Sequence, residues 1–242
     1  MKRVQIGGEN PRRARRGVPG AQRLAIAILA LAGTLGAQVA QQANSTYQTE
    51  DGRKSVAQGL AAPNREQTQK PGELIRTMGL EPEMTVADVG TGVGYMLPYL
   101  SRRVGPAGRV LAEDIFDDFL AGAKQTAEDQ KLANITFIKG TETDPNLPEG
   151  QVDMELVLDA YHHFDYPEKM LAALRKALKP DGKLVVVEYY KRESAMPNGR
   201  ALTHIRLDMP DAIKEIEANH FHLLMEKEHI KNVQYVLVLE KS

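Results

Sequence analysis

From residue 71 onward, short β-branched segments alternate with longer helical ones, and this order constrains the fold more than any other feature of the sequence. The short segments have the length of buried strands, and the segments between them have the length and apolar spacing of helices. Strands are expected at 85–90, 108–115, 134–140, 152–160, 182–190, 222–230 and 232–242. Helices are expected at 71–80, 94–104, 117–132, 167–180 and 212–221.

Strands joined by helices of this length predict a parallel sheet with helices on both faces, a doubly wound α/β fold of the Rossmann-like type. The C-terminus departs from the alternation. Its last two expected strands, 222–230 and 232–242, are separated only by Lys231. So short a connection requires an antiparallel pair, which we expect at the edge of the sheet.

The first seventy residues differ from the rest of the chain. Residues 1–40 contain a basic stretch, an apolar run over 24–32 and then small residues, the order of a secretory signal. The apolar run is shorter than the roughly 20 residues of a membrane span, so we expect a cleaved signal or an uncleaved N-terminal anchor. A basic disordered tail is the alternative. Residues 41–70 are polar without periodicity and are interpreted as a linker, which leaves 71–242 as the folded domain.

This N-terminal pattern predicts an exported protein that is periplasmic or anchored to the inner membrane, with membrane association only through residues 1–40.

Residues 1–37 hold seven of the 31 basic and one of the 32 acidic residues, so the remainder carries 24 basic and 31 acidic residues, a net charge of −7. Such a body is unsuited to nucleic-acid binding, which requires neutralisation of phosphates. Cysteine is absent, which excludes thiol nucleophiles, disulfides and cysteine-ligated metals.

A glycine-rich loop follows the first expected strand. Gly90, Gly92 and Gly94 allow a sharp turn and a close approach of the backbone to a ligand. Tyr95 stands where the dinucleotide pattern G-x-G-x-x-G has its last glycine. Asp88 precedes the loop and would repel a pyrophosphate, whereas it could accept hydrogen bonds from an ammonium group. These differences favour a nucleoside that carries an amino acid over NAD.

Two further turns complete this expected binding site. Glu113 and Asp114 end the second strand, and a carboxylate there offers two acceptors to the vicinal hydroxyls of a ribose. We assign this role to Asp114. The remaining predicted contacts are Ile115, which would cover one face of an adenine, and Thr141 and Glu142, which would flank its edge.

Residues from about 65 to 242 resemble the class I S-adenosylmethionine-dependent methyltransferases, in particular small-molecule enzymes of the ubiquinone/menaquinone-biosynthesis type and an exported bacterial subgroup with a Tyr-His-His-Phe segment. The resemblance lies in the stretches 65–96, 108–115, 140–164 and 178–190. It implies the cofactor S-adenosyl-L-methionine and the strand order 3-2-1-4-5-7-6, with strand 7 antiparallel.

By the same resemblance, a set of loop residues would line the methionine end of the cofactor: Asp88, Gly90, Thr91, Gly92 and Gly94. Tyr95, which follows them, is predicted to contact the cofactor as well. The chain departs from the usual pattern at two positions. Val93 replaces a commoner small or hydroxylated residue, and Thr68 stands where an aromatic residue often precedes the first helix. The change at Thr68 concerns how the segment before the first expected helix covers the cofactor.

The segment after the fourth strand carries the candidate catalytic residues. Asp159, Tyr161, His162 and His163 should lie where strands one and four diverge, the usual ligand crevice of doubly wound sheets. Asp159 could contact the methionine ammonium, either histidine could act as a base, and Tyr161 could orient an acceptor. The histidines could instead cap the next helix or pack with the strand end.

A metal site at the histidine pair is not expected, because adjacent side chains diverge and the i, i+4 spacing of helical ligands is missing. His204 and Arg206 belong to a possible acceptor lid over 191–210, which is equally well an exposed loop. We interpret the remaining histidines as structural or surface residues.

The sequence thus predicts a methyltransferase that acts on a small-molecule acceptor through in-line displacement, with transfer to oxygen, carbon or nitrogen left open. A noncatalytic S-adenosylmethionine-binding protein of the same fold is the alternative. An NAD-dependent oxidoreductase ranks third because of Tyr95, Asp88 and the terminal hairpin.

Overall fold

The structure is a computed structural model that describes residues 1–2 and 40–242. The predicted secretory signal or anchor over residues 1–40 therefore falls almost wholly outside the described residues. Among the residues described, no helix combines the length and the apolar character needed to cross a membrane.

A seven-stranded sheet forms the centre of the fold, and its order is β3-β2-β1-β4-β5-β7-β6. Strands β1 to β5 pair in parallel, whereas β7 is antiparallel to both β5 and β6. This arrangement confirms the predicted topology. The strands are β1 Thr85–Val89, β2 Arg109–Asp114, β3 Ile135–Lys139, β4 Val152–Leu158, β5 Leu178–Tyr189, β6 Phe221–Ile230 and β7 Gln234–Lys241.

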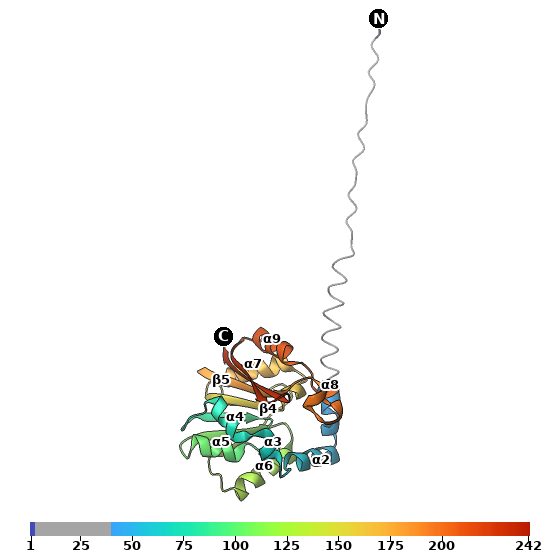
Figure 1. Cartoon of the computed structure of the whole chain (residues 1–242). Helices are drawn as coiled ribbons and strands as arrows, with labels where there is room; N and C mark the ends of the chain where they lie inside the picture. Colours follow the sequence, from blue (N-terminus) through green and yellow to red (C-terminus); the bar gives the residue numbers. More distant parts are fainter. Residues whose placement is uncertain (3–39) are drawn as a thin grey trace. The chain divides into compact units, whose positions relative to one another are not determined.

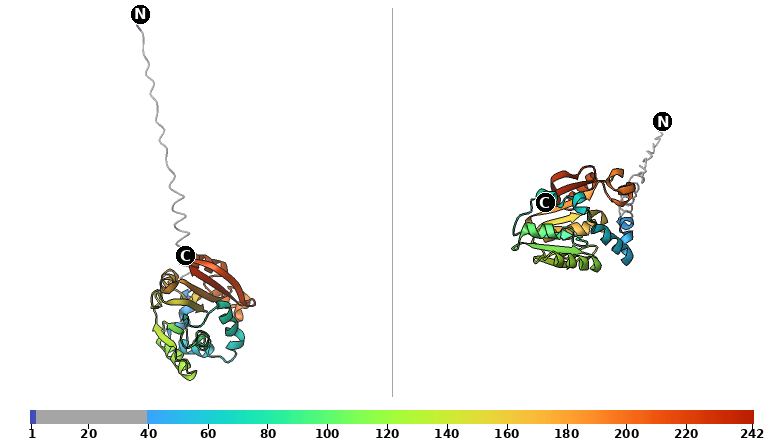
Figure 2. Two further views of the ribbon diagram at one scale, coloured as in Figure 1. Left: turned by 90° about the vertical axis from the view of Figure 1, so that its left-hand side faces the viewer. Right: turned by 60° about the horizontal axis from the view of Figure 1, so that its bottom comes forward.

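Helices cover both faces of this sheet (Figure 1; two further views in Figure 2). Successive side chains of β1 point to opposite faces: Val86 packs in a core with helices α4, α5 and α6, and Ala87 in a second core with α7 and α9. The helical elements are η1 Ser45–Gln48, α2 Glu50–Leu60, α3 Arg65–Gln69, α4 Pro71–Met78, α5 Leu97–Val104, α6 Asp117–Asp129, η2 Tyr161–His163, α7 Pro167–Ala177, η3 Glu193–Ala195, η4 Pro197–Gly199, α8 Ala201–His204 and α9 Met209–Ala218.

The ends of several elements differ from the prediction: α5 begins at Leu97, α6 ends at Asp129, and α9 covers Met209–Ala218. Helix α7 ends at Ala177, and β5 begins at Leu178 rather than at residue 182, because Leu178 pairs with Val152 of β4. The terminal hairpin has a longer turn than the single Lys231 expected. Val233 donates a backbone hydrogen bond to the Ile230 carbonyl, and Asn232 takes the left-handed conformation at φ 60°. Asparagine tolerates this conformation better than most residues, which is why the turn forms here.

Residues 41–70 are not the irregular linker that their polarity suggests, because η1, α2 and α3 occupy most of this segment. The Thr49 side chain caps α2 by accepting from the Gly52 amide, a local stabilisation of about 1 kcal/mol in typical helices. Tyr47 supplies the tertiary anchor, since its ring stacks on Phe116 and meets Phe119 edge-on. A few aromatic contacts therefore hold a segment whose overall composition is polar.

Gly140, which follows β3, permits Glu113 to lie beneath the glycine-rich loop. A Cβ added at Gly140 would lie 1.8 Å from Glu113 Oε1, and the other carboxyl oxygen of Glu113 accepts from the Gly90 amide. Gly140→Ala should therefore lower the free energy of unfolding by about 1–3 kcal/mol, the usual cost of overpacking. Urea unfolding measures this change. Gly72→Ala is the control, because the nearest atom to its Cβ is 3.9 Å away, and equal stability losses in both variants would contradict the prediction.

Candidate active site

A cavity of about 460 Å³ opens at the carboxyl ends of β1, β2 and β4. This is the crevice in which doubly wound sheets bind their ligands. The residues predicted to bind the cofactor gather here with one exception: Asp88, Gly90, Thr91, Gly92, Tyr95, Asp114, Ile115, Thr141, Glu142 and Asp159 all line the cavity. Gly94 does not. A Cβ at Gly94 would meet Leu97 at 2.9 Å and Ala123 at 3.1 Å, so this glycine allows the loop to pack on α6.

The loop at the floor of the cavity depends on three glycines with positive φ: Gly90 at 73°, Gly92 at 57° and Gly94 at 82°. A Cβ at Gly90 would lie 2.9 Å from the Cβ of Ala160, and one at Gly92 would lie 2.9 Å from a methyl group of Leu60. The Gly92 amide donates to Asp114 across 2.9 Å. The loop and the acid after β2 are thus held as one unit.

Several carboxyl groups line the cavity, and three of them, the buried Asp88 and Asp114 and the half-buried Asp159, are held there by hydrogen bonds. Asp88 accepts from the Thr91 hydroxyl at 2.7 Å, and Asp114 accepts from the Phe116 amide at 3.0 Å as well as from Gly92. Burial raises the pKa of both carboxyls to about 6. Burial, with the Glu188 charge second, raises the pKa of Asp159 to about 7.

Asp159 is positioned from two distant parts of the chain. It takes the left-handed conformation at φ 53° and accepts from Gln234 of β7 at 2.7 Å and from Gln69 of α3 at 3.2 Å. An acidic cavity with apolar walls at Ile115 and Phe116 fits a ligand that has an aromatic base, hydroxyl groups and a positive charge.

The N-terminal helices cover this cavity. Asn44, Tyr47 and Leu60 line it, and the Tyr47 ring meets His163 edge-on with 4.8 Å between centroids. Arg65 lies over the Tyr95 ring at 4.3 Å. The sequence pattern does not indicate these residues, because the polarity of 41–70 predicts a linker. One signal in the sequence pointed to a different cover for the cavity: Thr68 stands where an aromatic residue is usual. In the structure, Tyr47 supplies an aromatic ring to the cavity lining from another position.

A second cavity, of about 720 Å³, adjoins the first. It is lined by polar side chains that include Gln69, Tyr189 and Arg200 and by three histidines. The two cavities share Tyr47, Leu60, Arg65, Asp159 and His163. These five residues therefore form the boundary between the two cavities.

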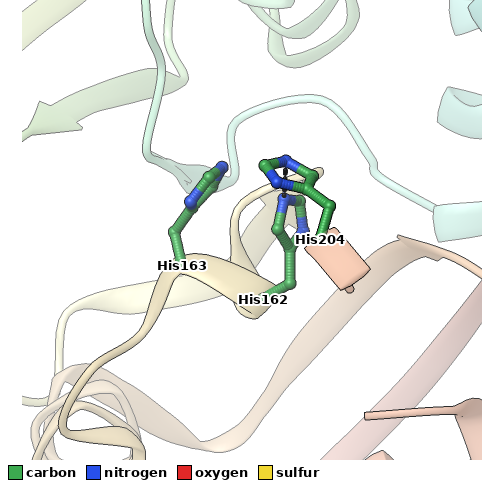
Figure 3. Close-up of side chains that lie close together, drawn as sticks. All are labelled: His162, His163 and His204. Atoms are coloured by element: carbon green, nitrogen blue, oxygen red, sulfur yellow. Dashed lines mark hydrogen bonds between the residues drawn. The ribbon is translucent and has the colours of Figure 1, made fainter. Parts of the chain in front are cut away.

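The histidines form a cluster of three, because His204 of α8 joins the predicted pair (Figure 3). The Nε2 atoms of His162 and His204 are 3.2 Å apart, and His162 Nδ1 lies 2.6 Å from a carboxyl oxygen of Glu188. Burial lowers the pKa of His163 well below its ordinary value and lowers the pKa of His204 to about 3. Neutral imidazoles therefore face the second cavity at His163 and His204.

Tyr161 is not brought to the site. Its ring is 2% exposed within the core, and its hydroxyl donates to Glu215 at 2.5 Å. Arg206, a possible lid residue, pairs with the same carboxylate and lines neither cavity. Glu215 of α9 thus holds both η2, through Tyr161, and the segment after β5, through Arg206, whose buried guanidinium requires a carboxylate partner.

Fold and site together define a Rossmann-like protein with a crevice at the carboxyl ends of its parallel strands and an adjoining second cavity. Residues 87–186 match the family model described as "Methyltransferase domain". This part of the chain, less than half of its length, is therefore assigned as similar to methyltransferase domains.

Curated relatives and solved structures agree with this assignment. The ubiquinone/menaquinone biosynthesis C-methyltransferase of Shewanella pealeana is 27% identical over 118 residues, which are 48% of this chain and 47% of the relative. The chain thus spans about half the length of the curated relatives it matches. A crystal structure described as a SAM dependent methyltransferase from Aquifex aeolicus is 26% identical, with a TM-score of 0.72 and coverage of 78% of this chain and 98% of that one.

The same fold also occurs in a protein with a different name. The cyclase SpnF aligns at 16% identity with a TM-score of 0.61, over 72% of this chain and 81% of its own. At this identity the likeness concerns the fold alone. A shared fold does not establish a shared reaction, so the activity must be argued from the site.

Proposed function

We propose that this protein transfers a methyl group from S-adenosylmethionine to a small-molecule acceptor. The observation that carries the proposal is the junction of the two cavities at Tyr47, Leu60, Arg65, Asp159 and His163. One cavity has the residues expected for a nucleoside with a charged amino acid, and the other is open to a second molecule. Methyl transfer requires this end-to-end arrangement of donor and acceptor.

The cofactor supplies a methyl carbon that is already activated by a positively charged sulfur. The chain must then bind both partners, align them and exclude water, and alignment alone can account for much of the acceleration. Asp114 is placed to bind the ribose hydroxyls, and Asp159 to bind an ammonium group. Tyr47 and Leu60 cover the junction from the N-terminal helices.

Proton removal is needed only for acceptors that lose a proton during transfer. His163 fronts both cavities and His162 fronts the second, so the base role predicted for either histidine remains a prediction that the geometry permits. Tyr161 takes no part in the proposal, because its hydroxyl is bound to Glu215. The curated relatives are C-methyltransferases by name, and carbon, oxygen and nitrogen acceptors all remain open for this chain.

Calorimetric titration with S-adenosylmethionine and with NADH tests the cofactor. We expect binding of the first and none of the second, and the reverse result would overturn the proposal. Incubation with methyl-labelled cofactor and small-molecule extracts then tests transfer. Binding without transfer to any fraction would favour the alternative of a noncatalytic cofactor-binding protein, since a shared fold does not establish a shared reaction.

Cofactor affinity should rise with pH between 5 and 7. A bound cation favours ionised carboxylates, whereas the cofactor-free protein keeps Asp88 and Asp114 partly protonated below their raised pKa values of about 6. Each of these carboxylates that must ionise for binding strengthens it by about tenfold over this range. The cofactor's amino group stays protonated throughout. Calorimetry at pH 5, 6 and 7 checks the trend, and an affinity that is flat or falls with pH would contradict it.

We also propose export of the protein, to the periplasm or as a membrane-anchored form, on the sequence pattern of residues 1–40. Cell fractionation with N-terminal sequencing of the mature chain tests this. A full-length chain that is recovered from the cytosol would refute export.

A further inference from the structure

We infer that His162, His163 and His204 form a binding site for a divalent metal ion of the zinc class, with its open position toward the second cavity. This goes beyond the proposed methyl transfer, which requires no metal. One potential ligand atom from each histidine lies within 4.8 Å of the other two. A metal is not expected from the sequence, because the adjacent histidine pair lacks the spacing of metal ligands and the third ligand lies 41 residues from His163.

The separation of the ring nitrogens fits metal coordination. Two imidazole nitrogens bound to one tetrahedral zinc ion are about 3.3 Å apart, given zinc–nitrogen bonds of about 2.0–2.1 Å. The Nε2 atoms of His162 and His204 lie 3.2 Å apart. Figure 3 shows all three rings extending to the same side of the η2 turn. The ligand atom of His163 lies within 4.8 Å of the other two, so filling the site requires His163 to shift toward them.

Hydrogen bonds on the outer side of two rings orient them as metal ligands. His162 Nδ1 lies 2.6 Å from Glu188, so its proton is held there and the Nε2 lone pair faces the cluster. Metal-bound histidines commonly have such a carboxylate partner. The carboxylate also supplies a negative charge beside the site.

Asn44 orients His163 in the same way. Its Nδ2 donates to the His163 carbonyl and to Asp165, which assigns the amide oxygen to His163 Nδ1 at 2.6 Å. An amide oxygen only accepts, so His163 Nδ1 carries the proton and Nε2 has the free lone pair. Two rings thus present unprotonated Nε2 atoms, the form that binds a metal.

One neighbouring charge opposes a cation. The Arg200 guanidinium lies 3.3 Å from His204 Nε2. Arg200 is exposed, so it can move into solvent when the site is filled. This contact makes a distinctive prediction, because removal of Arg200 should strengthen metal binding, whereas removal of a ligand should weaken it.

The three histidines line the second cavity, so the fourth coordination position would be filled from that cavity. Three protein ligands with one open position are typical of catalytic rather than structural zinc sites. The next inference rests on the proposed function. The methyl acceptor in the second cavity would be a molecule that binds the metal ion through an oxygen, nitrogen or sulfur atom. Metal ligation would occupy the lone pairs that a catalytic base needs.

Titration of the tag-free, chelator-treated full chain with Zn²⁺ and with Co²⁺ tests the site, by calorimetry and by the visible absorption of the cobalt complex. We expect one ion per chain, an affinity at least about tenfold lower in His204→Gln, and a higher affinity in Arg200→Ala. His222→Gln, on an exposed histidine of β6, is the matched control and should not change binding.

Weak binding that is equal in the parent chain, His204→Gln and His222→Gln would overturn the inference and indicate surface binding only. Titration of the same samples with S-adenosylmethionine separates this result from a failure of the proposed function. His204 does not line the cofactor cavity, so its replacement should leave cofactor affinity unchanged. That result also shows that the variant is folded.

Discussion

Gly92→Asp should abolish measurable binding of S-adenosylmethionine while the protein remains folded. Gly92 lines the cavity, and a side chain there would extend toward Leu60 and into the space between the loop and the N-terminal helices. The new carboxylate would also lie beside Asp114, whose oxygen accepts from the Gly92 amide. Loss of the loop geometry removes several ligand contacts at once, and we expect at least about a 1,000-fold loss of affinity, or about 4 kcal/mol.

Two variants separate the causes in the calorimetric measurement. Gly92→Asn has nearly the same shape without the charge and should bind more tightly than Gly92→Asp. Gly79→Asp is the control for backbone strain, because Gly79 has a similar φ of 68° with nothing within 4 Å of its Cβ. Cofactor binding in Gly92→Asp at parental strength would refute the assignment of the loop.

Asp114→Asn should weaken S-adenosylmethionine binding by about 100-fold, because the amide replaces one charged acceptor with a donor. Hydrogen bonds to charged groups contribute about 1.5–3 kcal/mol each. The carboxylate of Asp114 also accepts from the Gly92 and Phe116 amides, so part of the loss would come from a less ordered loop. Calorimetric dissociation constants of the parent and the variant give the ratio directly.

Asp117→Asn is the matched control for this change. Asp117 begins α6 three residues after Asp114, and its side chain is 87% exposed in an ion pair with Lys139. It does not line the cavity. Its replacement should leave the affinity within about twofold, as expected for an exposed ion pair. Equal effects at Asp114 and Asp117 would show that Asp114 has no specific role.

The sheet could be predicted from the sequence because its signals are local. Each buried strand is a short apolar run between turn residues, and the connection between the last two strands is too short for anything but an antiparallel pair. The cofactor cavity could be predicted for a related reason. Parallel strands end at the same edge, so the residues after β1, β2 and β4 had to converge there.

The errors concern residues whose place depends on distant contacts. The segment 41–70 has few apolar residues, and its helices are held by Tyr47 against Phe116 and Phe119 of a segment about 70 residues away. Tyr161 follows β4 as a catalytic residue would, yet its hydroxyl is bound by Glu215 of α9. The local sequence around a side chain such as Tyr161 does not indicate whether it meets a ligand in the cavity or a carboxylate on a distant helix.

The sequence by itself determined the doubly wound sheet, the glycine-rich loop and the carboxyl groups at its edge, since periodicity and chain order are sufficient for these. Only the tertiary structure decided what covers the cavity and that His204 joins His162 and His163. Those contacts join segments 41 to more than 100 residues apart, as in the hydrogen bond between Asn44 and His163. Such pairings depend on the packing of complete surfaces, which is a property of the folded chain rather than of any local pattern.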